Sequence, residues 1–172
     1  ALLDKHLADH TPYNAKYRII KKDGSIAVWV DRGTALPGKN GKPYKMIGVI
    51  KDITENKKAE DALMRVSKAV ESSSDAIGMS DPQGHHFYHN KSFTELFEYT
   101  PVELEAAGGG PAVFIDKNVA REIFDTIKGG ESWSGEVEMV SKSGRRFTVL
   151  ERADAIKDEA GKVIGLVGVH TD

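Results

Sequence analysis

Alternation of apolar and polar positions is clearest over residues 133–140, which predicts a half-buried β-strand. Residues 141–144, with Gly144 last, supply a tight turn, and a second strand is expected over 146–156. After a turn at 158–161, residues 163–171 are apolar on both faces, as in a central or doubly covered strand. The pattern therefore predicts a three-stranded antiparallel meander.

An earlier part of the chain repeats this pattern. Residues 17–52 align with 137–172 without a gap, and nine of the 36 pairs are identical. This predicts equivalent strands over 13–21, 25–36 and 43–51, with turns at 21–24 and 38–41. Because Ala1 corresponds to Arg121 in this register, we expect the chain to begin inside a domain.

The segment ahead of the second meander predicts two strands followed by short helices. Residues 76–80 and 85–89 flank a turn at 81–84. Helix starts are marked by Asn90, by the capping box that opens at Thr100, and by Asp116. The order predicts an α+β domain, with a five-stranded antiparallel sheet and short helices on one face.

Between the two copies, residues 55–73 contain neither Gly nor Pro and predict a helix. Ala59, Leu63, Val66 and Val70 are spaced as the seam of a coiled coil. Two interpretations stay open: an amphipathic helix that packs on its own sheet, and a short coiled coil between two chains.

Composition then narrows the function classes. The chain has no Cys, which excludes disulfides, thiolate chemistry, iron–sulfur clusters and covalent haem. A formal net charge of -2 argues against a nucleic-acid-binding surface. No apolar run approaches the length of a membrane helix, and no hydrolase, metalloprotease or nucleotide-binding motif is present. We therefore expect a non-catalytic module whose partners are proteins or small ligands, and the composition leaves the compartment open.

Three stretches resemble the PAS family of sensory domains: residues 73–84, residues 88–104 and residues 48–54. The resemblance implies a complete PAS domain over 74–172, the C-terminal, PAC-like half of a first PAS domain over 1–54, and a connecting helix over 55–73. It also implies a cytoplasmic sensory or relay module of a tandem-PAS signalling protein, most often a histidine kinase or a diguanylate cyclase. Asp52, Ile53 and Thr54, and Asp172 in the second copy, resemble the motif through which PAS domains pass on a signal.

A ligand pocket is expected between the sheet and the helices of residues 74–172, although core packing is the better explanation for any single lining residue. A homodimer through the connecting helix or PAS surfaces and an effector domain in the same chain are the other expected partners. The pocket candidates are Ile77, Met79, His89, Phe93, Phe97, Phe114, Phe124, Ile127, Trp133, Val137, Met139, Phe147, Val149 and His170.

No cofactor is certain from the sequence. The resemblance disfavours haem, because residues 116–128 contain no His, and it leaves a non-covalently bound flavin open. On the strand at 85–89, alternation places His85 and His89 on one face and His86 on the other. We therefore expect no metal site, because only His85 and His89 would converge, roughly 7 Å apart, with no carboxylate beside them.

Individual residues allow alternatives. The resemblance implies an apolar residue at the position of His89, and Ile50 of the first copy corresponds to His170. Two interpretations of these histidines stay open: that they face a ligand, and that they are hydrogen-bonded core residues. Glu151, which Arg152 follows, is interpreted as part of a structural ion pair or as an exit-signal contact. The run Gly108–Gly110 is interpreted as slack that lets the pocket wall move. Half a PAS sheet exposes an edge and an apolar face, so residues 1–52 are expected to dock, pair with a second chain or be mobile.

Overall fold

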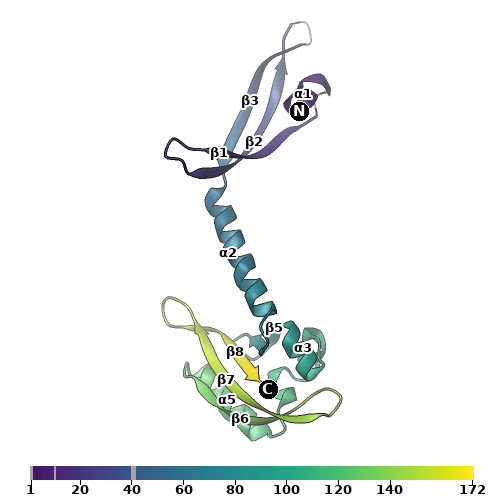
Figure 1. Ribbon diagram of the computed structural model, residues 1–172, viewed down its shortest axis with the longest axis vertical. Coiled ribbons are helices and arrows are strands. Elements are labelled where there is room, and N and C mark those ends of the chain that lie inside the picture. The colour runs from purple at the N-terminus through teal and green to yellow at the C-terminus, as the bar shows by residue number, and fades with distance from the viewer. Residues whose placement is uncertain (1, 10, 40–41) are drawn as a thin grey trace. The chain divides into compact units, whose positions relative to one another are not determined.

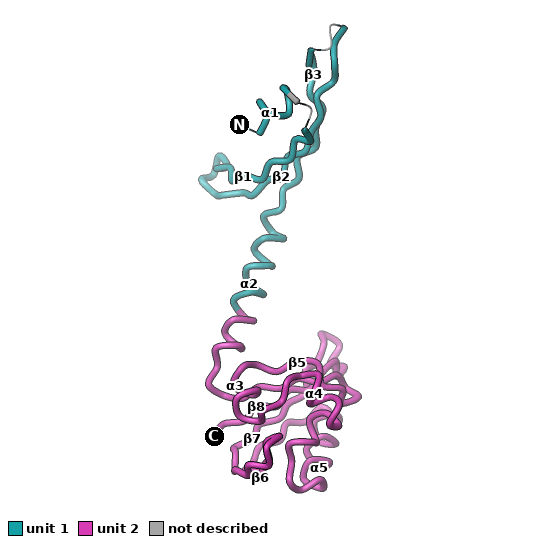
Figure 2. The backbone as a smooth tube through the Cα atoms, turned by 90° about the vertical axis from the view of Figure 1, so that its right-hand side faces the viewer, with its two compact units in different colours: residues 1–65 teal, residues 66–172 magenta. Residues whose placement is uncertain are grey.

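A computed structural model describes residues 2–9, 11–39 and 42–172. The chain forms two compact units, residues 1–65 and residues 66–172 (Figure 2). Helix α2 (Thr54–Glu71) begins in the first unit and ends in the second. The element order is shown in Figure 1.

The first unit is a three-stranded antiparallel sheet with one short helix. Helix α1 (Leu2–Asp9) precedes β1 (Tyr13–Ile20), β2 (Ile26–Pro37) and β3 (Pro43–Asp52), and the strand order is β1-β2-β3. The turn predicted at 38–41 falls partly outside the described residues.

One buried histidine fastens α1 to this sheet. The His6 Nε2 atom accepts a hydrogen bond from the Ala35 backbone N–H at 2.8 Å. Nε2 is therefore the unprotonated nitrogen, and Nδ1 carries the proton that it shares with the Thr11 carbonyl.

The second unit contains a five-stranded antiparallel sheet in the order β5-β4-β8-β7-β6. Its strands are β4 (Ala76–Ser80), β5 (His86–His89), β6 (Trp133–Val140), β7 (Arg146–Lys157) and β8 (Val163–Thr171). Its helices are α3 (Lys91–Phe97), α4 (Pro101–Ala106), the 3₁₀ helix η1 (Gly110–Val113) and α5 (Lys117–Lys128). This confirms the predicted α+β fold.

The helix starts confirm the three predicted caps. Thr100 and Glu103 form a reciprocal capping box, and Asp116 accepts from the Asn118 backbone. Asn90 is fully buried and uses every hydrogen-bonding position of its amide: Oδ1 accepts from the backbone N–H groups of Ile77 and Phe93, and Nδ2 donates to the carbonyls of Val70 and Asp75. Asn90 thus joins the end of α2 to the start of β4 and to α3.

The core of the second unit lies between the sheet and helices α3–α5. Strand β7 shows how it is built, because Val149, Glu151 and Ala153 are buried while the residues between them are exposed. The buried apolar residues are Ala76, Phe93, Phe97, Leu104, Val113, Phe114, Ala120, Ile123, Ile127, Val137, Met139, Val149, Ala153 and Leu166.

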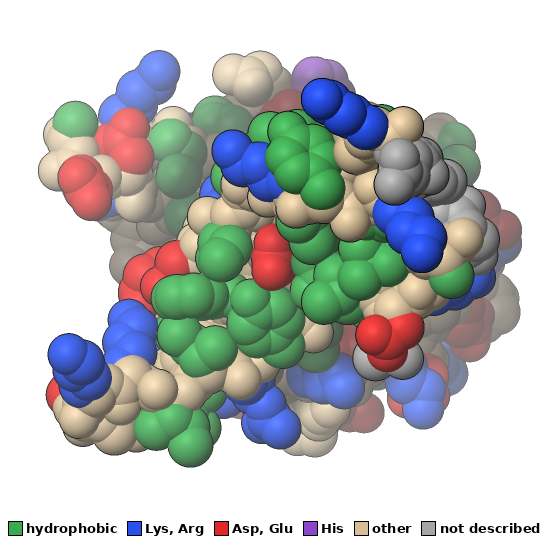
Figure 3. Space-filling view, turned by 90° about the horizontal axis from the view of Figure 1, so that it is seen from above, with side chains coloured by type: hydrophobic (Ala, Val, Ile, Leu, Met, Phe, Trp, Pro, Cys, Tyr) green, Lys and Arg blue, Asp and Glu red, His purple; other side chains and the backbone are tan. Residues whose placement is uncertain are grey.

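Apolar side chains also remain exposed. Figure 3 shows them gathered on one face of the molecule, and in the first unit Tyr44, Val49 and Ile50 are more than half exposed. On α2 no residue is buried, and Leu63 of the predicted seam is 72% exposed. The described part of the chain therefore does not show the seam of α2 packed on a sheet. Among the described residues, none of the helices combines the length and the apolar composition needed to span a bilayer.

Candidate functional site

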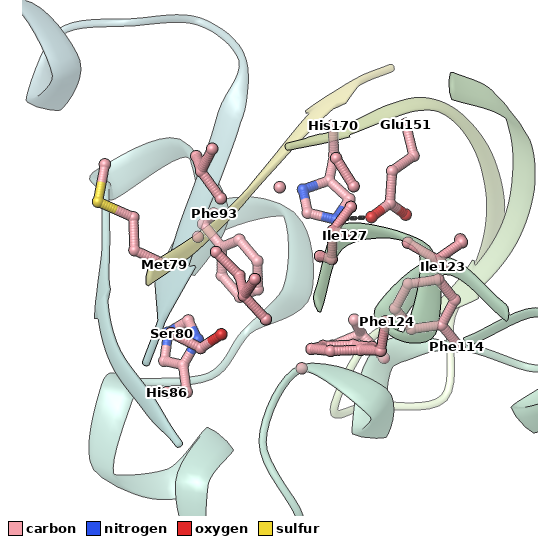
Figure 4. Close-up of a pocket in the computed structure, with 17 residues that line it drawn as sticks. Met79, Ser80, His86, Phe93, Phe114, Ile123, Phe124, Ile127, Glu151 and His170 are labelled. Atoms are coloured by element: carbon pink, nitrogen blue, oxygen red, sulfur yellow. Dashed lines mark ion pairs between the residues drawn. The ribbon is translucent and has the colours of Figure 1, made fainter. Parts of the chain in front are cut away.

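A small cavity of about 50 Å³ lies between the sheet of the second unit and its helices (Figure 4). Strands β4, β7 and β8 form one side, and the rings of Phe93, Phe114 and Phe124 form much of the rest. The residues that line it are Gly78, Met79, Ser80, His86, Phe93, Gly110, Val113, Phe114, Ile123, Phe124, Ile127, Glu151, Ala153, Leu166, Val167, Gly168 and His170.

Two polar side chains meet in this apolar wall. Glu151 and His170 are direct cross-strand partners in β7 and β8, and they are 3% and 5% exposed. The Glu151 Oε1 and His170 Nε2 atoms are 3.7 Å apart, the contact dashed in Figure 4. The His170 Nδ1 atom bonds to the Ala76 carbonyl at 2.9 Å, which fixes the ring on β4. Among the residues that the structure describes, none forms a hydrogen bond with the Glu151 Oε2 atom.

Burial makes this pair uncharged at neutral pH. It raises the pKa of Glu151 to about 8 and lowers the pKa of His170 to about 4, because desolvation penalises the charged form of each. The contact in Figure 4 therefore joins a protonated acid to a neutral imidazole. Because a carbonyl only accepts, the His170 proton lies on Nδ1, and Nε2 presents its lone pair toward Glu151.

A second pair of imidazoles lies beside the cavity. The His86 Nε2 and His89 Nδ1 atoms are 2.8 Å apart, and the His89 ring stacks on Phe93 with centroids 4.6 Å apart. Burial lowers the pKa of His86 to about 4 and also lowers the pKa of His89. This pair is therefore uncharged as well, with one ring donating to the other.

The structure corrects the expected arrangement of the β5 histidines. A register shift in the β4–β5 pairing, between Met79 and Ser80, interrupts the alternation, so His86 and His89 lie together. His85 precedes the strand and bonds to Asp81 at 2.8 Å instead of approaching His89. No group of three or more metal-ligating side chains occurs in the described ranges.

Phe124 lines both the cavity and a groove on the protein surface. The groove is lined by Phe124 itself, by the turn residues Gln83 and Gly84, and by Lys117, Arg121 and Lys128 of α5. A Cβ at Gly110 would lie 2.9 Å from the Phe124 ring. The missing side chain at Gly110 therefore gives Phe124 its place in the cavity wall.

The predicted pocket residues divide into two groups. Met79, Phe93, Phe114, Phe124, Ile127 and His170 line the cavity. The others lie elsewhere: Phe97, Val137, Met139 and Val149 are buried in the core, Trp133 and Phe147 pack against it, His89 bonds to His86, and Ile77 does not line the cavity.

Sequence reasoning missed Ser80, His86 and Glu151 as cavity residues. For Glu151 a signal was available, because alternation places it on the same face of β7 as Val149 and Ala153. The interpretation as an ion pair with Arg152 is wrong: Arg152 points to the other, exposed face, and the partner of Glu151 is His170. For His86 no such signal was available, because the register shift between β4 and β5 interrupts the alternation of the two faces.

The proposed exit residues of the first copy form one hydrogen-bonded junction. The Asp52 carboxylate accepts from the backbone and hydroxyl of Thr54, and these bonds lower the pKa of Asp52. The Thr54 Oγ1 atom accepts from the Val28 N–H at 2.9 Å, and the Ile53 N–H donates to the Val28 carbonyl. The start of α2 is thus fixed to β2. In the second copy, Asp172 follows β8.

The cavity as described does not accommodate a flavin. A cavity of roughly 150 Å³ holds one benzene ring, and this one is about 50 Å³. A three-ring system would require wall residues such as Phe124 to move.

Comparison with known proteins gives consistent matches. A family described as PAS fold matches residues 1–50 and 86–170. The non-motile and phage-resistance protein of Caulobacter vibrioides is 26% identical over 151 residues, which cover 83% of this chain and 18% of that protein. This chain therefore spans less than a fifth of that relative.

Solved structures show the same fold. A PAS domain from Colwellia psychrerythraea has a TM-score of 0.56 at 22% identity, over 65% of this chain and 97% of that one. A domain of a sensory box sensor histidine kinase/response regulator from Geobacter sulfurreducens has a TM-score of 0.55 at 24% identity, over 69% and 99%. An RNA-binding light-oxygen-voltage receptor has a TM-score of 0.54 at 12% identity, over 99% and 80%.

Proposed function

Because this chain belongs to the PAS fold family, we propose that it is a non-catalytic, cytoplasmic sensory and relay module of a larger signal-transduction protein. In this proposal the cavity of the second unit binds a small molecule. The effector is a histidine kinase domain in the same chain, as the name of the Geobacter sulfurreducens relative suggests.

The observation that carries the proposal is the unpartnered Glu151 Oε2 atom in the cavity wall. A buried acceptor without a donor is destabilising, and proteins retain few of them. A bound molecule that donates to Oε2 would remove this penalty. In a purely structural core, no bound molecule would offset the cost of burying this acid.

We assign the chain as a tandem arrangement. Residues 74–172 are the complete PAS domain, residues 55–73 are the connecting helix, and residues 1–54 are the C-terminal half of a first PAS domain. The family match to 1–50 as well as 86–170 supports this division.

A route from the cavity to α2 is built into the second unit. The ring of Phe93 lines the cavity, and its backbone N–H bonds to Asn90, which also holds the Val70 carbonyl of α2. A ligand that shifts α3 would therefore act on the end of α2. Differential binding of about 1–3 kcal/mol between two signalling states is sufficient.

Dimerisation through α2 belongs to the same proposal. The exposed Leu63 and Val66 share the predicted seam, and pairing with a second copy would bury them. This stripe also favours a second candidate function, a ligand-free dimerisation module.

Native mass spectrometry of the freshly purified chain, with an absorbance spectrum of the same sample, tests the ligand. We expect a bound mass without a flavin absorbance band. A yellow protein would instead identify a flavin-based redox sensor.

A thermal-shift screen of metabolites then uses the two tryptophans as reporters. Trp29 lies in the first unit and Trp133 in the second. Each is observed in a variant in which it is the only tryptophan. A ligand of the cavity should raise the melting temperature reported by Trp133 and leave the melting temperature reported by Trp29 unchanged. No bound mass, no stabilising compound and a concentration-dependent dimer would favour the dimerisation module.

A further inference from the structure

We propose that Glu151 and His170 form an acceptor pair that selects a small, planar N–H donor of the amide type. The inference rests on the proposed function, because it specifies the chemistry of the molecule that the cavity binds.

Both members of the pair present acceptors. The Glu151 Oε2 atom is buried and unpartnered, and Oε1 faces the His170 Nε2 atom at 3.7 Å, too far for a hydrogen bond. The His170 Nδ1 proton is committed to the Ala76 carbonyl, so Nε2 is a lone pair. The Nε2 lone pair attracts the Glu151 proton to Oε1, the oxygen that faces it, and Oε2 is then an acceptor without a donor among the described residues.

The lining residues determine the charge that the cavity accepts. The described lining residues include neither Lys nor Arg. Besides Glu151, the titratable side chains that line the cavity are those of His86 and His170. A carboxylate or phosphate would therefore lie beside an acid with no opposite charge, which is unfavourable. A neutral donor meets no such penalty.

The shape of the cavity favours a flat group. Phe93, Phe114 and Phe124 present rings to it. On the sheet side, a Cβ at Gly168 would lie 3.3 Å from the His170 ring and 3.5 Å from the Glu151 Oε1 atom. The absence of a side chain at Gly168 leaves room for the pair.

The volume limits the ligand to a few heavy atoms. A cavity of about 50 Å³ is well below the roughly 150 Å³ that holds benzene. Acetamide, acetone and acetate are suitable probes because they have nearly the same shape. Acetamide donates N–H bonds, acetone only accepts, and acetate is an anion.

The test is a titration of the whole isotope-labelled chain with each probe, followed by NMR. The reporters are the backbone amides of Gly78, Gly110 and Gly168, which line the cavity. We expect saturable shifts with acetamide at these amides. Because an unpaired buried acceptor is costly, we expect acetone and acetate to bind at least about fivefold more weakly.

Variants assign the effect to the acid. Glu151→Met replaces the carboxyl with an apolar side chain of similar length, and it should remove the preference for acetamide over acetone. Glu151→Gln keeps one acceptor oxygen and should retain part of the preference for acetamide. Asp31→Asn is the matched control, because Asp31 occupies the equivalent position of the first unit, and it should change nothing.

The outcomes separate this inference from the proposed function. Equal binding of acetamide and acetone, unaffected by Glu151→Met, would leave a ligand-binding cavity but overturn donor selection. Tighter binding of acetate would overturn it as well. No saturable shift with any probe would overturn the inference and also count against ligand binding by the cavity.

Discussion

Strands β1–β3 and β6–β8 form the same meander in two different settings. Asp31 pairs with Ile50 in the first, and Glu151 pairs with His170 in the second, both at an offset of 120 residues. Even the irregularities correspond, at Leu36/Pro37 and at Ile156/Lys157. The two sheets therefore agree in strand register and turn position.

Burial is where they differ. Leu166 is 2% exposed in β8, whereas its equivalent Met46 is 37% exposed in β3. His170 is buried, whereas its equivalent Ile50 is 53% exposed. Helices α3–α5 account for this, because they pack on the second sheet, whereas the first sheet has one short helix, α1, which packs mainly on β1 and β2.

Strand register therefore determines which residues meet, while the layer of helices over the sheet determines their chemistry. An acid opposite an imidazole is an ordinary surface pair on an open sheet. Under helices α3–α5 it becomes an uncharged pair with displaced pKa values. The candidate site therefore belongs to the second unit.

The largest expected difference comes from truncating equivalent residues. Leu166→Ala should lower the free energy of unfolding of the second unit by about 2–5 kcal/mol, because it opens a cavity in a packed core. Met46→Ala should cost the first unit less, about 1–2 kcal/mol, because that side chain is already 37% exposed in the folded chain and loses less buried surface. Urea unfolding with Trp133 or Trp29 as the only tryptophan measures each unit. Equal losses would break the comparison.

A smaller effect is expected in the pH dependence of stability. Between its ordinary pKa of 4.5 and about 8, Glu151 is ionised in the unfolded chain but protonated in the folded one. The second unit should therefore lose about 1.4 kcal/mol per pH unit over that range from this group. His86 and His170 act oppositely from 6.5 down to about 4, because only the unfolded chain binds their protons.

Together these groups predict maximal stability of the second unit near pH 6.5. Glu151→Gln should remove most of the decline from pH 6.5 to 8. His85 should contribute a small remaining decline, because its exposed pairing with Asp81 raises its pKa. Urea unfolding followed by Trp133 at several pH values measures both proteins, and an unchanged slope in the variant would contradict the assignment.

Local turns should behave alike in the two units. Gly24 and Gly144 have φ values of 81° and 89°, and a Cβ at either would meet nothing within 4 Å. Alanine at either position should therefore cost a similar amount, about 1–2 kcal/mol, from backbone conformation alone. Urea unfolding of the two single-tryptophan variants gives the change in the free energy of unfolding for each unit. A large difference would mean that the turns, too, depend on the covering layer.

The smallest effect concerns the position equivalent to His170. Ile50→His places an imidazole opposite Asp31 on the open sheet, and it should change stability by less than about 0.5 kcal/mol. Its pKa should stay near the ordinary value of about 6.5, in contrast to His170. NMR of the histidine ring protons follows both. A value near 4 for the new histidine would show that register alone displaces the pKa.

Most of the fold was predictable because its signals are local. The alternation over 133–140 gave β6 its limits, and Asn90, Thr100 and Asp116 cap helices as their residue types predict. The repeat at an offset of 120 carried the strand limits to the first unit.

The site was less predictable because it depends on contacts between distant residues. The role of Glu151 follows from His170 on the next strand and from the helices above it, neither of which is adjacent in sequence. His86 reached the cavity through a register shift that no residue pattern announces. Local alternation therefore placed both residues but assigned neither to the cavity.

A pH titration of the Glu151 side-chain carboxyl carbon by NMR in the folded chain, assigned with Glu151→Gln, shows directly whether the helices above the second sheet displace its pKa. We predict a carboxyl that is still protonated at pH 7 and titrates near 8. Titration near 4.5 would contradict this prediction, because Glu151 would then be a solvated surface acid and the two sheets would not differ in the chemistry they support.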